Sequence, residues 1–110
     1  MAVLVVDDDD DSLALLAMLL ERRGFNVVCA ASLAEARARL IDTELSAVVA
    51  DVHLGDGNGL TLYDEARALP APRGLLRFVV LTGQSTVDVA ADVQVLRKPF
   101  DLDALVAALG

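Results

Sequence analysis

Aspartates follow two separate apolar runs of this chain, an arrangement that could bind a metal ion and accept a phosphoryl group. Asp7 and Asp8 come directly after Val3–Val6, and Asp51 comes directly after Ala47–Ala50. Carboxylates held close together repel one another, and a divalent cation relieves that repulsion. Mg²⁺ is the cation that such a set of carboxylates suits, because it prefers oxygen ligands. The acids therefore predict a magnesium site.

Two further polar sites end apolar runs in the second half of the chain. Thr82 and Gly83 follow Phe78–Leu81, and Lys98, the only lysine of the chain, follows Val93–Leu96. In an open sheet of parallel strands, ligands bind outside the carboxyl ends of the strands. We therefore expect the aspartates, the hydroxyl, the glycine amide and the ammonium group to converge on one cleft.

Such a cleft could transfer a phosphoryl group to an aspartate, a reaction that needs mostly positioning and electrostatic stabilisation. Asp51 is the favoured nucleophile, because it stands alone on the central strand, whereas Asp7 and Asp8 crowd each other and suit the cation. Lys98 would pair with one phosphoryl oxygen. The Thr82 hydroxyl and the Gly83 amide would donate hydrogen bonds to the others.

The hydrophobic pattern predicts one α/β domain over residues 1–110, a doubly wound parallel sheet in which strands and helices alternate. Five runs are predicted as strands: Val3–Val6, Phe25–Cys29, Ala47–Ala50, Phe78–Leu81 and Val93–Leu96. Four further segments are predicted as helices: one capped at Asp10, Asp11 or Ser12 and ending before Gly24, one from the Ser32–Glu35 capping box to Leu40, one over Leu60–Leu69, and one from the Asp101 cap to Leu109.

Composition narrows the partners and the location of the protein. A formal charge of −8 argues against binding to nucleic acid or to an anionic membrane surface. The longest apolar stretch is too short to span a bilayer, so membrane insertion is not expected. A single cysteine, Cys29, is interpreted as a small core residue ending a strand, and it favours a reducing, cytoplasmic location.

With these residues in place, the whole chain resembles a two-component response-regulator receiver domain. The resemblance lies in five short pieces in the family's order and spacing: Val5-Val6-Asp7-Asp8, Val48-Val49-Ala50-Asp51, Asn58-Gly59-Leu60, Leu81-Thr82-Gly83 and Lys98-Pro99-Phe100. The resemblance implies a flavodoxin-like, five-stranded sheet of order 2-1-3-4-5 with helices on both faces. It also implies a cis peptide between Lys98 and Pro99.

The same resemblance implies a role for each site residue. Asp51 would be the phosphoacceptor, and Asp8 and Asp51 would bind Mg²⁺ directly, with Asp7 acting through water. The main-chain carbonyl of His53 would be the third protein ligand, with no role for its imidazole. Three further residues would act on the phosphoryl group: Thr82 as the switch hydroxyl, Gly83 as a backbone donor, and Lys98 as the phosphate-sensing lysine.

Three features depart from the family pattern. Val95 stands where receivers usually carry Tyr or Phe, so an aromatic rotamer switch cannot operate there. Only nine residues, Gln84 to Asp92, connect the fourth and fifth strands, whereas a parallel crossover usually needs about a dozen or more. Helix 4 is therefore expected to be shortened to one or two turns, or to be replaced by an extended link in which Val87 and Val89 pack downward. Gly55, where Pro is common, should loosen the loop after Asp51.

These observations predict a signalling switch that takes a phosphoryl group from a histidine kinase or a histidine phosphotransfer protein, and that acts on a downstream protein by contact. It would be no enzyme beyond its own phosphorylation and dephosphorylation. The chain would be a single-domain regulator or a receiver excised from a hybrid kinase. Two alternatives stay open: a degenerate receiver that binds its partner constitutively, and an aspartate-nucleophile phosphohydrolase, which would usually carry an acid where His53 stands.

Overall fold

A computed structural model describes residues 2–69, 76–83, 89 and 92–109 of the chain. Its main sheet has five parallel strands in the order β2-β1-β3-β6-β7. The strands of this sheet are β1 (Ala2–Val6), β2 (Val27–Ala30), β3 (Leu45–Asp51), β6 (Arg77–Thr82) and β7 (Val93–Arg97). The strands β4 and β5 form a separate small hairpin, so β6 and β7 are the fourth and fifth strands of the main sheet. Its order is therefore the 2-1-3-4-5 order that the family resemblance implies.

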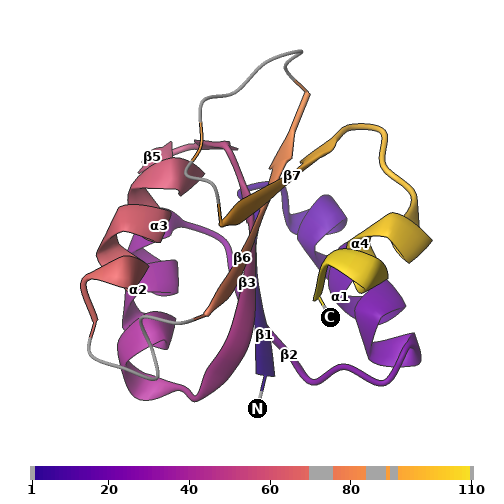
Figure 1. The fold of residues 1–110 in the computed structure, drawn as a ribbon, viewed down its shortest axis with the longest axis horizontal. Helices are drawn as coiled ribbons and strands as arrows, with labels where there is room; N and C mark the ends of the chain where they lie inside the picture. The colour runs from indigo at the N-terminus through magenta and orange to yellow at the C-terminus, as the bar shows by residue number, and fades with distance from the viewer. Residues whose placement is uncertain (1, 70–75, 84–88, 90–91, 110) are drawn as a thin grey trace.

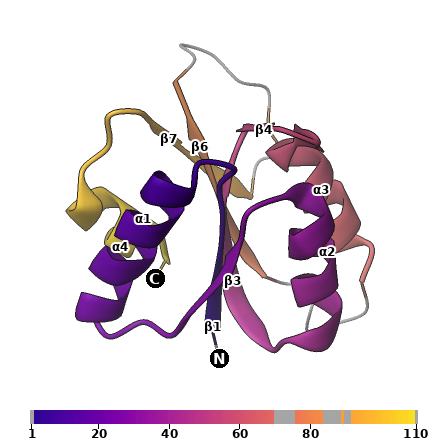
Figure 2. The same ribbon diagram turned by 180° about the vertical axis from the view of Figure 1, so that it is seen from behind.

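Helices cover both faces of the sheet. The described residues form four of them: α1 (Asp10–Arg22), α2 (Leu33–Asp42), α3 (Gly59–Arg67) and α4 (Leu102–Leu109). The helices α2 and α3 lie on one face, and α1 and α4 lie on the other (Figure 1). The reverse view shows the same three layers (Figure 2). In the part of the chain described here, no helix is both long enough and apolar enough to cross a membrane.

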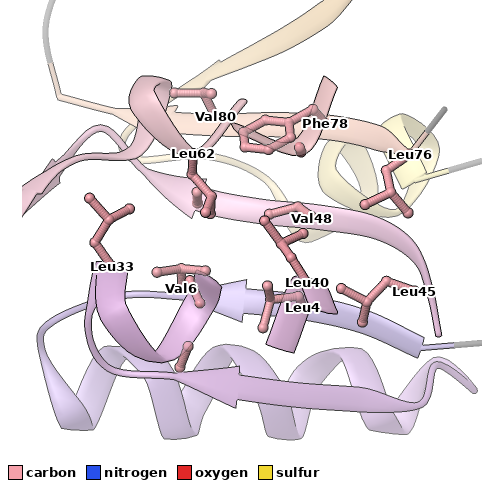
Figure 3. Packing of buried hydrophobic residues seen from close by; sticks show 14 of the residues in the cluster. Leu4, Val6, Leu33, Leu40, Leu45, Val48, Leu62, Leu76, Phe78 and Val80 are labelled. Carbon is pink, nitrogen blue, oxygen red and sulfur yellow. The ribbon is translucent and has the colours of Figure 1, made fainter. Parts of the chain in front are cut away.

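The two faces of the sheet bury separate hydrophobic clusters, because successive strand residues point to opposite faces. On the face of α2 and α3, Leu4, Val48 and Phe78 pack with Leu62 and neighbouring side chains (Figure 3). The cluster under α1 and α4 contains side chains of the alternate strand positions, such as Val5. Burial on both faces explains why the central strands read as nearly continuous apolar runs.

The capping signals of the sequence place most helix starts well. Ser32 caps α2, since its Oγ accepts a hydrogen bond of 3.1 Å from the Glu35 amide. Asp101 accepts one of 3.2 Å from the Asp103 amide at the start of α4. The cap predicted for α1 was wrong. Asp9 is the N-cap, one residue before the earliest candidate, because its extended backbone already ends the turn that follows β1.

The interpretation of Cys29 as a core residue was also wrong, because the residue is exposed. It lies on β2, an edge strand of the sheet that pairs with β1 alone among the described strands. An edge strand is covered less completely than a central one, and only Ala30 of β2 is fully buried. Apolar character alone could not reveal which strand lies at the edge.

The connection from β6 to β7 lies largely outside the described residues. Residues 84–88 and 90–91, which include Val87, are among these, so the prediction about helix 4 concerns a segment that is not described. Val89 is partly buried and packs against the cluster on the face of α2 and α3, as expected. The carboxylate of Asp92 accepts hydrogen bonds from Tyr63 and from Arg67, both on α3. The end of the connection is therefore attached to α3. Val95 is half-buried on β7.

Candidate functional site

Asp51 and Lys98 meet at the carboxyl edge of the sheet. Asp51 is the last residue of β3, and it is buried, with only 8% of its surface exposed. The Lys98 Nζ atom lies 2.6 Å from Asp51 Oδ2, which makes both a hydrogen bond and an ion pair. Lys98 is placed there because it directly follows β7, at the same edge of the sheet. The sequence expectation that these two residues meet agrees with this geometry.

Asp7 and Asp8 follow β1 at the same edge, and they differ in burial. Asp7 is 6% exposed, whereas Asp8 is exposed to solvent. Burial raises the pKa of the Asp7 carboxyl, a hydrogen bond from the Asp9 amide lowers it, and the negative charge of Asp51 raises it further. Asp7 is therefore a partly desolvated carboxylate within electrostatic reach of Asp51, Asp8 and Lys98.

Thr82 is the last residue of β6 and pairs with Arg97, the residue before the lysine, and Gly83 follows it. Thr82 is 1% exposed, and its carbonyl accepts a hydrogen bond of 2.7 Å from the Lys98 amide. The peptide between Lys98 and Pro99 is cis, as the resemblance implies. At Gly83, a Cβ atom would have no heavy atom within 4 Å, so the backbone there is open to an approaching group. Thr82 thus contacts Lys98 through the backbone, and Gly83 is the next residue of the chain.

The segment after Asp51 turns back at once in a short hairpin. Its strands are β4 (His53–Leu54) and β5 (Gly57–Asn58), paired antiparallel, with His53 opposite Asn58. Asn58 then caps α3 by accepting a hydrogen bond of 2.8 Å from the Leu60 amide. His53 is exposed and contributes its backbone to this hairpin. The sequence indicated only a loop after Asp51, although a Gly-Asp pair between two short strands is a known signal for a hairpin.

The first residue of α3 is Gly59, and this position leaves no room for a side chain. A Cβ atom at Gly59 would lie 2.2 Å from the main-chain oxygen of Asp51, far inside van der Waals contact. The Gly59 amide donates a hydrogen bond of 2.9 Å to the Val52 carbonyl. Absence of a side chain lets α3 begin directly against the backbone of the acidic strand end.

The donor set at this edge fits a hard cation. The side chains of Asp7, Asp8 and Asp51 offer oxygen ligands only, which is what Mg²⁺ prefers. Among the described residues, no three acidic, histidine or cysteine side chains are grouped closely enough to hold a metal ion without help. Because Mg²⁺ usually keeps several of its waters, an open set of carboxylates is compatible with binding it.

The sequence model of the response regulator receiver domain family matches residues 3–110. The chain belongs to this family. Receiver domains are signalling modules of two-component systems, and domains of this family generally bind Mg²⁺. The five-stranded sheet, with helices on both faces, is the CheY-like fold of the family.

Relatives of this receiver domain are regulatory proteins. The acid tolerance regulatory protein ActR of Sinorhizobium medicae is 38% identical over 114 residues, which cover 98% of this chain and 57% of that protein. The photosynthetic apparatus regulatory protein RegA of Cereibacter sphaeroides is also 38% identical, over 98% of this chain and 60% of its own. The receiver domain thus spans less than two thirds of the length of these relatives.

A solved structure of a response regulator from Burkholderia pseudomallei superimposes on the receiver domain with a TM-score of 0.85. The two sequences are 32% identical, and the match covers 99% of this chain and 66% of the other. That structure contains a phosphorylated aspartic acid, a calcium ion and citrate.

Proposed function

We propose that this receiver domain is a phosphorylation-dependent signalling switch whose phosphoacceptor is Asp51. The observation that carries this proposal is the 2.6 Å contact between Lys98 Nζ and Asp51 Oδ2, because it places the chain's single ammonium group on one carboxylate of the acidic cleft. A compact ammonium group suits a phosphoryl oxygen next to a metal ion. The Burkholderia pseudomallei structure, which holds a phosphorylated aspartic acid, supports the same reading.

The reaction expected at Asp51 is transfer from a phosphohistidine. A carboxylate oxygen of Asp51 forms the new bond to phosphorus, the bond from phosphorus to the imidazole nitrogen breaks, and the imidazole keeps the electron pair and takes up a proton. Lys98 leaves the carboxylate and pairs with a phosphoryl oxygen. The Thr82 hydroxyl and the Gly83 amide donate to the remaining oxygens. These groups stabilise charge where it develops, which is the main need of phosphoryl transfer.

The metal expected at this site is Mg²⁺. Asp8 and Asp51 would bind it through their carboxylates, His53 through its main-chain carbonyl, and Asp7 through water. When bound, the ion would neutralise charge on the phosphoryl oxygens. The raised pKa of the Asp7 carboxyl supports this assignment, because burial and neighbouring carboxylates disfavour its charged form in the absence of a cation.

A groove beside the site offers a place for the phosphodonor protein to dock. It has a volume of about 370 Å³ and runs from Asp7 and Lys98 along α1. Its other lining residues are mostly apolar: Ser12, Leu15, Leu16, Leu19, Leu81, Pro99, Phe100 and Leu102. Leu15 of this groove is 53% exposed, and Met18, also on α1, is 42% exposed, so α1 presents large apolar side chains to solvent beside the site. A helix carrying a phosphohistidine could place its apolar face here.

The donor would be a histidine kinase or a histidine phosphotransfer protein, and the output would be contact with a downstream protein, not with nucleic acid. The formal charge of −8 supports a protein partner over nucleic acid. We propose a cytoplasmic location, where such donors present their phosphohistidine. The regulatory names of the relatives support a role in signalling.

The direct test is labelling with acetyl phosphate and Mg²⁺, followed by mass measurement of the intact protein. We expect a gain of one phosphoryl group in the wild type and in Asp64→Asn, a control on α3, and none in Asp51→Asn. The adduct should also disappear when Mg²⁺ is removed with a chelator. Absence of any adduct in the wild type would overturn the proposal and favour a constitutive interaction module. Sustained release of phosphate from phosphomonoesters would instead favour the phosphohydrolase.

A further inference from the structure

The hairpin β4–β5, which carries the expected carbonyl ligand of the metal, is attached to the sheet at its base. The Val52 amide donates a hydrogen bond of 3.0 Å to the Leu81 carbonyl, and the Val52 carbonyl accepts one of 2.9 Å from the Gly59 amide. These bonds fix the point at which the chain leaves β3 and the point at which it enters α3. They leave the far end of the hairpin, residues 55–56, to be held by something else.

The tip of the hairpin is held by the N-terminus of α2. Asp56 Oδ1 accepts a hydrogen bond of 2.8 Å from the Leu33 amide, and Asp56 Oδ2 accepts one of 3.2 Å from the Ala34 amide. The first amides of a helix have no partner within the helix, so a carboxylate from another segment satisfies them well. One side chain of the hairpin thus binds two backbone donors of α2 that are more than 20 residues away in the sequence.

Packing on both sides of the tip supports the same arrangement. At Gly57, a Cβ atom would lie 2.8 Å from Leu33 Cδ2, so the hairpin rests directly on the first residue of α2. At Gly55, a Cβ atom would lie 3.5 Å from Asp8 Oδ2, so the opposite side of the tip faces the acidic cleft. The tip therefore contacts α2 through Gly57 and lies close to Asp8 at Gly55, although its residues stay exposed to solvent. It lies on the side of the sheet where α2 and α3 lie (Figure 2).

We propose that Asp56 is a positioning residue for the metal and phosphoryl site, because it holds the hairpin tip on α2 and thereby fixes the backbone of His53 to Gly55 against Asp8. This inference rests on the proposed function, since it assigns the main-chain carbonyl of His53 to the metal. Asp56 itself touches neither the metal nor the phosphoryl group. It acts through the backbone, in the way that outer groups orient metal ligands in other proteins.

Loss of Asp56 removes both hydrogen bonds from the hairpin tip to α2, and leaves the bonds at the base and the packing of Gly57 on Leu33. The carbonyl of His53 must then be ordered when the ion binds, and this ordering lowers the apparent affinity for Mg²⁺. The ion pair between Lys98 and Asp51 does not involve Asp56, so it should persist. The effect expected is a selective loss of metal affinity rather than a collapse of the whole cleft.

Ser32 supplies a matched control at the same helix end. Its Oγ caps the Glu35 amide, so this hydrogen bond stays within the first turn of α2 and does not involve the hairpin. Ser32→Ala and Asp56→Ala therefore both remove N-terminal caps from α2, and only Asp56→Ala releases the hairpin. Urea unfolding would verify that both variants fold and that their midpoints fall by comparable amounts. If Asp56→Ala does not fold, Asp56→Asn keeps one acceptor oxygen and serves in its place.

The experiment is a titration of the full chain with Mg²⁺, followed by amide NMR, together with amide hydrogen exchange of residues 53–58 without metal. We expect Asp56→Ala to weaken Mg²⁺ binding by about tenfold and to speed exchange in the hairpin, whereas Ser32→Ala keeps wild-type affinity and exchange there. If the two variants changed Mg²⁺ affinity and exchange equally, or if neither variant changed them, the inference would be overturned. Binding of Mg²⁺ by the wild type would still uphold the proposed function in that case. A wild type that binds no Mg²⁺ would overturn both.

Discussion

The Nζ atom of Lys98 lies 2.6 Å from Oδ2 of Asp51, although the two residues are 47 positions apart in the chain. Lys98 is partly exposed, with a side-chain exposure of 40%, so this pair contributes little to stability. Its importance is positional. Under the proposed function, the ammonium group that pairs with the Asp51 carboxylate before phosphorylation would bind a phosphoryl oxygen afterwards.

Replacement of Lys98 should slow phosphorylation of Asp51. In Lys98→Gln we expect the rate with acetyl phosphate and Mg²⁺ to fall on the order of 100-fold, because one preorganised cation is removed from the developing charge. Arg97→Gln removes a neighbouring exposed cation of β7 and serves as the matched control, with a rate near that of the wild type. Rates are measured from the mass of the intact protein over time. Equal slowing in the two variants would mean that overall charge, not the position of Lys98, controls the reaction.

Gly59 should tolerate no side chain. In Gly59→Ala the new Cβ atom would lie 2.2 Å from the Asp51 carbonyl oxygen, so the backbone must move. We expect a loss of roughly 1–3 kcal/mol in the free energy of unfolding, the usual cost of overpacking. Gly83→Ala is the control, because a Cβ atom there meets nothing within 4 Å. Urea unfolding measures both. A Gly59→Ala protein as stable as the wild type would show that α3 can shift away from Asp51 without cost.

A charged side chain in the groove along α1 should slow phosphotransfer from a protein donor and leave labelling by a small-molecule donor unchanged. In Leu15→Asp we expect phosphotransfer from a phosphohistidine protein to slow by about tenfold or more, because a buried charge at an interface centre is unfavourable. Labelling by acetyl phosphate should not change. Ile41→Asp changes an equally large side chain, 62% exposed, on α2, and should leave both reactions as in the wild type. Slower labelling by acetyl phosphate in Leu15→Asp would point to damage of the site itself.

The attachment of the hairpin to α2 should depend on pH. Hydrogen bonds from the Leu33 and Ala34 amides, with the Arg37 guanidinium nearby, hold the pKa of the Asp56 carboxyl below its ordinary value of 3.8. Asp56 therefore stabilises the fold above pH 3.8, and this contribution is lost as the pH falls from 3.8 through the folded pKa. The difference in Tm between the wild type and Asp56→Ala should be constant near neutrality and should narrow only in that acidic range. If the difference in Tm instead narrowed near neutrality, a group other than Asp56 would be responsible for it.

Local patterns predicted the parallel sheet and the edge at which Asp51 and Lys98 meet. Apolar runs ending in Asp7, Asp51 and Thr82 indicate buried parallel strands, and parallel strands bring their carboxyl ends to one edge. Lys98 could be placed there because it directly follows the last strand. The cap at Ser32 was visible because its partner is only three residues away.

Features that depend on contacts between distant segments could not be read from the sequence. Asp56 caps a helix more than 20 residues earlier, and no local pattern connects it to Leu33. Cys29 has the composition of a core residue, yet its exposure follows from the position of β2 at the sheet edge. The attachment of Asp92 to Tyr63 likewise joins α3 to the start of β7 across a long stretch of chain.

Amide NMR with Mg²⁺ and beryllofluoride, a mimic of the phosphoryl group, tests most directly whether these residues form one phosphoacceptor site. We expect a single saturable transition that shifts the amides of Asp8, Asp51, Thr82, Gly83 and Lys98 together, and no transition in Asp51→Asn. Shifts confined to other parts of the chain, or an unchanged spectrum of the wild type, would contradict a shared magnesium and phosphoryl site at this edge of the sheet.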